Sequence, residues 1–95
     1  MTVRKVCDDN GHLKPDETFT WKNPSNEDAK IEPDPDSVFP FVPDRNRSYV
    51  FVAKNSTKTG KTLKSPPLAQ NSTTYNYRVD GGDCPDSSPK NVTIP

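Results

Sequence analysis

Two cysteines carry the best-defined chemistry in this chain of 95 residues. Cys7 and Cys84 lie near opposite ends of the sequence, and a disulfide between them would close a loop that spans most of it. A loop of that length stabilises a fold by about 4 kcal/mol in the chain-entropy view. Two separate cysteines and one histidine fall short of the ligand set of a structural zinc site. We therefore predict a Cys7–Cys84 disulfide, with two unrelated buried thiols as the alternative.

Acidic side chains gather in turns close to both cysteines. If the disulfide forms, these carboxylates approach one another, and Ca²⁺ takes about six to eight oxygen ligands of this kind. The competing explanation is that aspartate simply favours turns, and the spacing matches no complete calcium-loop signature. We favour the turn explanation and keep calcium as the alternative. The candidate ligands are Asp8, Asp9, Asp80, Asp83 and Asp86.

A catalytic constellation is not visible. His12 is the only histidine and follows a turn, so it lacks the neighbours of a hydrolytic triad. The sequence contains no G-x-S-x-G motif, no H-E-x-x-H motif and no glycine-rich phosphate loop. We predict that the protein is not an enzyme and needs no cofactor.

One irregular segment is apolar enough to contact a partner. It reads Phe39-Pro40-Phe41-Val42-Pro43. In a protein with a thin core, such aromatic residues most often fill one open end of the fold. If instead they face solvent, Phe39, Phe41 and Val42 would anchor an interface. We favour the first reading and keep the second as the alternative.

Charge and hydropathy limit the possible partners. Thirteen basic residues balance thirteen acidic ones, which argues against nucleic acid because its binders present a basic face. Apolar stretches extend over only a few residues, against the roughly 20 that a membrane span requires. A disulfide would favour an extracellular, cell-surface or particle-surface location.

The elements that must position these residues read as strands. Eleven prolines are scattered through the chain, and no stretch keeps a helical period. Alternation puts Phe19 and Trp21 on one face of a strand, and Tyr75, Tyr77 and Val79 on one face of another. Short strands between turns predict an antiparallel two-sheet Greek-key sandwich, formed as a single domain over residues 1–95. The expected strands are Thr2–Cys7, Glu17–Asn23, Ala29–Glu32, Ser48–Lys54, Thr73–Val79 and Asn91–Ile94.

Three of these segments resemble the cupredoxins, the fold of plastocyanin and azurin. Phe19-Thr20-Trp21-Lys22-Asn23 is similar to the family's V-T-W-x-N strand, and Tyr75-Asn76-Tyr77 to its late Y-x-Y strand. Val92-Thr93-Ile94 looks like the closing strand, so the resemblance covers residues 13–95. It implies a Greek-key β-sandwich, although immunoglobulin-like sandwiches share such strands.

The copper ligands of that family have no counterpart in this chain. Asn26-Glu27-Asp28-Ala29 stands where the resemblance places the first histidine, and Val79 stands where it places the cysteine. A blue copper site needs two imidazoles and a thiolate. The chain is similar to small bacterial cupredoxin-like proteins that lack the metal and have no assigned activity. The resemblance therefore implies the fold without electron transfer.

The sequence favours a non-catalytic binding or structural module, such as a subunit of a surface or particle assembly. Its contact would be a protein partner or a second copy, reached through sheet edges or the Phe39–Pro43 segment rather than a deep pocket. Thr2–Cys7 is the expected edge strand. The alternative is a β-sandwich that binds a small ligand or calcium.

Overall fold

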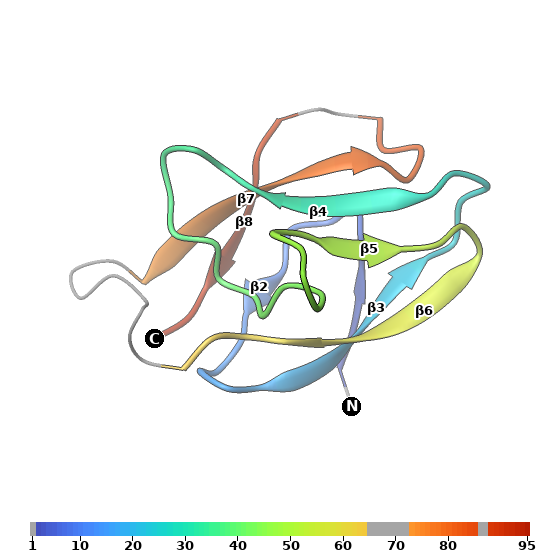
Figure 1. Ribbon diagram of the computed structural model, residues 1–95. Coiled ribbons are helices and arrows are strands. Elements are labelled where there is room, and N and C mark those ends of the chain that lie inside the picture. Colours follow the sequence, from blue (N-terminus) through green and yellow to red (C-terminus); the bar gives the residue numbers. More distant parts are fainter. Residues whose placement is uncertain (1, 65–72, 86–87) are drawn as a thin grey trace.

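The chain folds entirely as β-structure. Over residues 2–64, 73–85 and 88–95, the part that the computed structural model describes, it forms eight strands and no helix. Figure 1 shows the long connection between β4 and β5 looping back across the molecule before β5 begins. The strands are β1 (Val3–Lys5), β2 (Gly11–His12), β3 (Thr18–Asn23), β4 (Ala29–Pro33), β5 (Val50–Val52), β6 (Ser56–Lys61), β7 (Thr74–Gly81) and β8 (Lys90–Thr93).

Two sheets pack into a sandwich, as expected. Sheet A has the strand order β1-β3-β6, and sheet B has the order β2-β8-β7-β4-β5. The expected purely antiparallel arrangement is wrong at two positions, because β1 runs parallel to β3 and β2 runs parallel to β8. Parallel neighbours need a crossover connection. Between β1 and β3 the chain crosses to sheet B, forms β2 there and then returns.

Each of the six expected strands is present with small shifts at its ends, and two further strands were not expected. β2 covers only two residues at the end of an acidic turn, too few for a pattern to show. β6 reads STKTGK and has no apolar side chain, so hydrophobic alternation could not reveal it. Its inward positions are Ser56, Lys58 and Gly60.

The core is built around four aromatic rings. Phe19 and Trp21 come from sheet A and Tyr77 from sheet B, and Phe41 enters between them from the β4–β5 connection. Ring centroids are 5.0 Å apart for Trp21 and Phe41 and 5.1 Å apart for Phe41 and Tyr77. Both ring pairs meet edge to face, the arrangement that aromatic pairs prefer. Phe41 thus joins the two sheets.

A glycine in β6 makes room for these rings. Gly60 pairs with Phe19 across the sheet, and a Cβ on it would lie 2.5 Å from Trp21 Nε1 and 2.8 Å from Phe19 Cζ. No side chain fits there without moving the rings. The polar strand β6 is therefore held in sheet A by the aromatic packing over Gly60 as well as by its ladder with β3.

Candidate functional site

The two cysteines meet as predicted. Their sulfur atoms are 2.09 Å apart and their Cα atoms 5.2 Å apart. The bond ties the turn after β1 to the turn after β7, which are far apart in the sequence. It therefore fixes the N-terminal strands of both sheets to the rest of the sandwich.

The structure describes four of the five acidic candidates, and it places them in separate local contacts. Asp9 Oδ1 accepts a hydrogen bond from the Asn91 N–H at 3.0 Å, and Asp80 lies on β7 opposite Lys30. Within residues 2–64, 73–85 and 88–95, no group of three histidine, cysteine, aspartate or glutamate side chains is placed to hold a metal ion. Asp8 lies in the bend after β1, and Asp83 lies in the turn after β7. Asp86 lies outside the described residues.

A buried phenol organises the turn that contains Asp8 and Asp9. Asn10 Nδ2 donates to the Tyr77 hydroxyl at 2.8 Å, and that hydroxyl donates to the Asp8 carbonyl at 3.3 Å. Burial raises the pKa of Tyr77 well above its ordinary value, although the hydrogen bond from Asn10 opposes the shift. The phenol therefore stays neutral and keeps its donor role across the physiological range.

Phe41, at the centre of the apolar segment 39–43, is part of the core as the favoured reading predicted, so the alternative partner contact through Phe41 is not available. Phe41 is fully buried against Phe19, Trp21 and Tyr77, and Phe39 packs half-buried on its ring. Val42 is 45% exposed, and its N–H donates to the Lys61 carbonyl. The segment fills one end of the sandwich because the two sheets leave room there for one more aromatic ring.

Interaction surfaces on such a sandwich are its strand edges and outer faces, and the edge at β5 is closed by side chains. The Phe51 N–H donates to Asp44 Oδ2 at 2.9 Å, and the Phe51 carbonyl accepts from Lys58 Nζ at 2.9 Å. Lys58 and Asp44 also form an ion pair at 2.6 Å. The backbone groups that a partner strand would need at Phe51 are therefore already bonded.

The edge at β1 is open. Thr20 donates its N–H to the Thr2 carbonyl at 2.8 Å, and Val6 donates to the Lys22 carbonyl at 3.0 Å, so even-numbered residues of this segment face β3. The N–H and carbonyl of Val3 consequently point away from the sheet, and they find no partner in the described part of the chain. The Val3 side chain is 56% exposed, more than any other large hydrophobic residue described. Prediction of Thr2–Cys7 as an edge strand is confirmed.

The outer face of sheet A carries only one sign of charge. Its three strands contain no acidic residue, and two lysines lie side by side because Lys5 pairs with Lys22 in the register of β1 and β3. The outward positions alternate with the buried ones along each strand. They are Val3, Lys5, Thr18, Thr20, Lys22, Thr57, Thr59 and Lys61.

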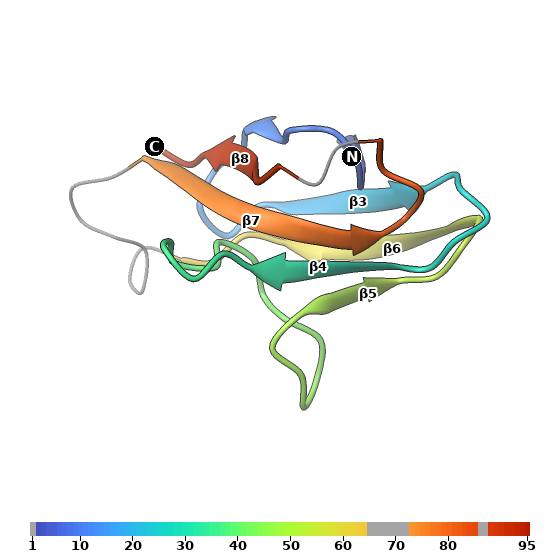
Figure 2. The ribbon, with the colours of Figure 1, turned by 90° about the horizontal axis from the view of Figure 1, so that it is seen from above.

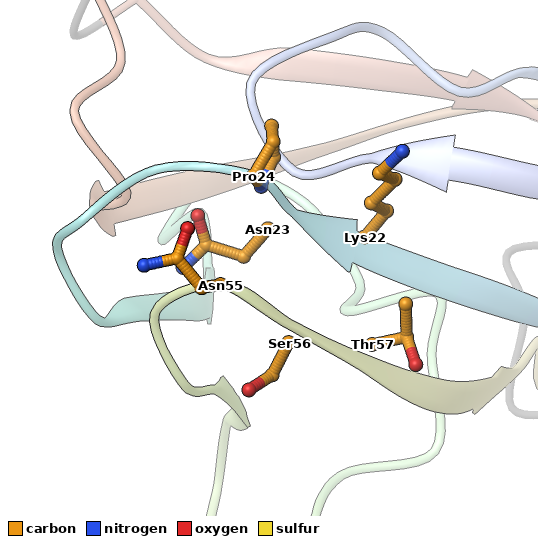
Figure 3. A pocket seen from close by; sticks show the side chains of 6 residues that line it. All are labelled: Lys22, Asn23, Pro24, Asn55, Ser56 and Thr57. Atoms are coloured by element: carbon orange, nitrogen blue, oxygen red, sulfur yellow. The ribbon is translucent and has the colours of Figure 1, made fainter.

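An open hollow of about 620 Å³ lies at one end of this face. Figure 3 shows that its lining comes from the end of β3 and the start of β6, with the Lys22 side chain on one side of the view and Asn23 and Asn55 on the other. Asn55 donates from Nδ2 to Asn26 Oδ1 at 2.8 Å, which fixes its amide at the rim. The lining residues are Lys22, Asn23, Pro24, Asn55, Ser56 and Thr57.

Sheet B presents a different outer face. Lys30 lies opposite Asp80, and Glu32 lies opposite Arg78, so charged residues of opposite sign are paired across β4 and β7. Beside them, a smaller hollow of about 370 Å³ includes Tyr49, whose ring is approached by Lys30 Nζ at 5.1 Å. These charges are balanced within the sheet itself.

Sequence reasoning missed the Lys5–Lys22 pair. The alternation in Glu17–Asn23 puts Lys22 on the face opposite Phe19 and Trp21, but the partner strand and its parallel register could not be read from the sequence.

No protein-family model matches the sequence, and no curated protein is significantly similar to it. No helix in the described part of the chain could cross a membrane.

Proposed function

We propose that this protein is a non-catalytic binding module that works through the free edge of β1. The partner is a second copy of the chain, as in a surface or particle assembly, whose own β1 pairs with this edge. The proposal rests on the N–H and carbonyl of Val3, which point outward and have no partner among the described residues. The Val3 side chain is also the most exposed large hydrophobic side chain in that part of the chain. Edge strands with such groups pair readily with another chain.

The other edges support this choice. At β5 the outward backbone of Phe51 is bonded to Asp44 and Lys58. β6 is an edge of sheet A as well, but its Lys61 carbonyl already accepts the Val42 N–H at 2.8 Å, and the strand has no apolar side chain. β2 has only two residues. β1 is the edge with both unpaired backbone groups and an apolar side chain.

Pairing of β1 with β1 in a second copy is self-complementary. A two-fold axis through the edge brings the same patch of both copies together, as in most homodimers. Each sheet A would then continue into its partner's sheet A. With three residues a side, the contact is small, so weak association with a dissociation constant of roughly 0.1 to 1 mM is expected for the isolated protein.

A cupredoxin-like origin of the sandwich is part of the proposal. Trp21 and Tyr77, two of the residues that carry the resemblance, face each other across the two sheets with centroids 6.3 Å apart. This supports a common core arrangement. His12 is the only imidazole in the chain, and both cysteines are paired with each other, so the proposal does not extend to copper chemistry.

The test is the mass in solution of two Val3 variants. Proline is compatible with an edge strand whose N–H faces outward, so Val3→Pro removes the donor and leaves the ladder with β3 in place. Val3→Thr keeps the N–H and is the matched control. Sedimentation up to about 1 mM should show self-association of the wild type, partial retention in Val3→Thr and loss in Val3→Pro.

Two outcomes would contradict the proposal. One is a wild-type protein that stays monomeric at the highest concentration. The other is a Val3→Pro variant that associates as well as the wild type while its far-ultraviolet circular dichroism is unchanged.

A further inference from the structure

The outer face of sheet A contains two neighbouring lysines whose charges repel each other and so do not stabilise the fold. Lys5 and Lys22 are register partners on neighbouring strands, where like charges directly opposite each other destabilise a sheet. Among the residues that the structure places, neither lysine forms an ion pair. Lys61, at the far end of the face, is compensated by Asp16 at 3.1 Å.

Sheet B shows that this arrangement is specific to one face. There, both register pairs of charged residues between β4 and β7 combine opposite signs, Lys30 with Asp80 and Glu32 with Arg78. The same chain therefore balances charge within one sheet and leaves it unbalanced on the other. An external anion would remove the repulsion between Lys5 and Lys22.

The surroundings of the two lysines are rich in hydrogen-bonding groups. Thr57 lies directly opposite Lys22 on β6, and Thr20 and Thr59 form the next outward pair along the same strands. The hollow beside Lys22 adds the Asn55 amide at its rim. Hydroxyl and amide groups on an open face suit a ligand that itself carries many hydroxyls.

We propose that the outer face of sheet A binds an anionic polysaccharide. Lys5 and Lys22 hold its carboxylate or sulfate groups, and Thr57 and the rim of the hollow bond the sugar hydroxyls. The hollow is open along the sheet rather than enclosed, so it accommodates a section of a chain (Figure 3).

Nucleic acid fits this face less well. Single strands bind largely by stacking bases on aromatic side chains, and the outward positions of β1, β3 and β6 include no aromatic residue. The chain also has no net charge to attract a duplex.

The experiment compares binding of four probes at low salt by isothermal titration calorimetry. Heparin supplies sulfate groups, polygalacturonate supplies carboxylates, dextran is a neutral polysaccharide, and an oligothymidylate represents nucleic acid. The variants are Lys5→Gln/Lys22→Gln on sheet A and Lys30→Gln on sheet B as the matched control.

One or both acidic polysaccharides should bind the wild type, and dextran should not. The double variant should bind about tenfold more weakly, because two exposed charge contacts are lost. Lys30→Gln should bind within about twofold of the wild type, a difference well below 1 kcal/mol. Which acidic probe binds better identifies sulfate or carboxylate as the preferred group.

Three results would overturn the proposal. The first is an absence of binding to both acidic polysaccharides. The second is equal affinity of the double variant and the wild type. The third is tighter binding of the oligothymidylate than of either polysaccharide, which would indicate nucleic acid instead.

Discussion

On each of the two open sides of the sandwich, one basic side chain reaches from sheet A to sheet B, but the groups around these two side chains differ. On the β5–β6 side, Lys58 reaches from sheet A to the Phe51 carbonyl of sheet B at 2.9 Å. On the β1–β2 side, Arg4 reaches from sheet A to the His12 carbonyl at 3.2 Å. Figure 2 shows β5 and β6 together on one side of the molecule and the N-terminal strands away from them. Each side thus carries one cation that closes the gap between the sheets.

The difference lies in what surrounds each cation. Lys58 has a carboxylate partner, and Asp44 also satisfies the Phe51 N–H, so every group at this crossing is bonded. Arg4 has no acidic partner at this crossing, and its Nε is buried with no partner in the described residues. The disulfide stands on this less complete side. One side is therefore stabilised by local side-chain bonds, and the other contains the disulfide and the open strand edge of β1.

The largest expected effect comes from removing the covalent bond. A Cys7→Ser/Cys84→Ser variant should lose about 4 kcal/mol of unfolding free energy, because the unfolded chain regains the entropy of a long loop. Urea denaturation of the variant and the oxidised wild type measures the loss. If the two sides differ as described, the amides of Val6 and Asn10 should exchange with deuterium through local opening before those of Val50 and Val52.

Two observations would contradict this prediction. One is reactive thiols in freshly isolated wild-type protein under denaturing, non-reducing conditions. The other is a variant whose amides on both sides of the sandwich lose protection equally, since that would mean that the disulfide does not act on one side in particular.

The next largest effect concerns the β5–β6 side, where side-chain bonds join the two sheets. Asp44→Ala removes the acceptor of the Phe51 N–H and the partner of Lys58, and should cost roughly 1 to 2 kcal/mol. The hydrogen bond accounts for most of this, because the Lys58 side chain is 36% exposed and water screens the ion pair. Asp44→Asn keeps an acceptor oxygen and serves as the control, with a smaller loss in urea denaturation. Equal losses in both variants would assign the contribution to the charge instead.

Two features of the molecule could be predicted from the sequence, a half-buried strand and the disulfide. The alternation of Phe19 and Trp21 predicted a half-buried strand, and the structure confirms it because side chains of period two must face opposite sides of a sheet. The Cys7–Cys84 pairing was predictable because only two cysteines exist. These features depend on local pattern or on simple counting.

Features that depend on packing between distant segments were out of reach. β6 has no apolar side chain, and its place in sheet A depends on the rings of Phe19 and Trp21 packing over Gly60. The Lys5–Lys22 pair depends on a parallel register that follows a crossover through β2, a strand of two residues. The sequence allowed Phe41 either in the core or at a solvent-facing interface. The structure places it in the core, between the two sheets.

The smallest effect distinguishes the two sides by pH. Tyr77 belongs to the β1–β2 side through its bonds with Asn10 and Asp8, and its folded-state pKa is raised above the ordinary value of 10.0. Stability from the neutral phenol is therefore complete below pH 10 and declines above it, because the unfolded chain ionises there while the folded chain resists ionisation. At pH 11 the decline should be about 1.4 kcal/mol.

Tyr77→Phe, which cannot ionise at this position, should be less stable at pH 8 but lose correspondingly less between pH 9 and pH 11. Tyr49 and Tyr75 are present in both proteins and cancel from the comparison. If the two proteins lose stability in parallel over this range, Tyr77 does not hold the β1–β2 side by a neutral hydroxyl.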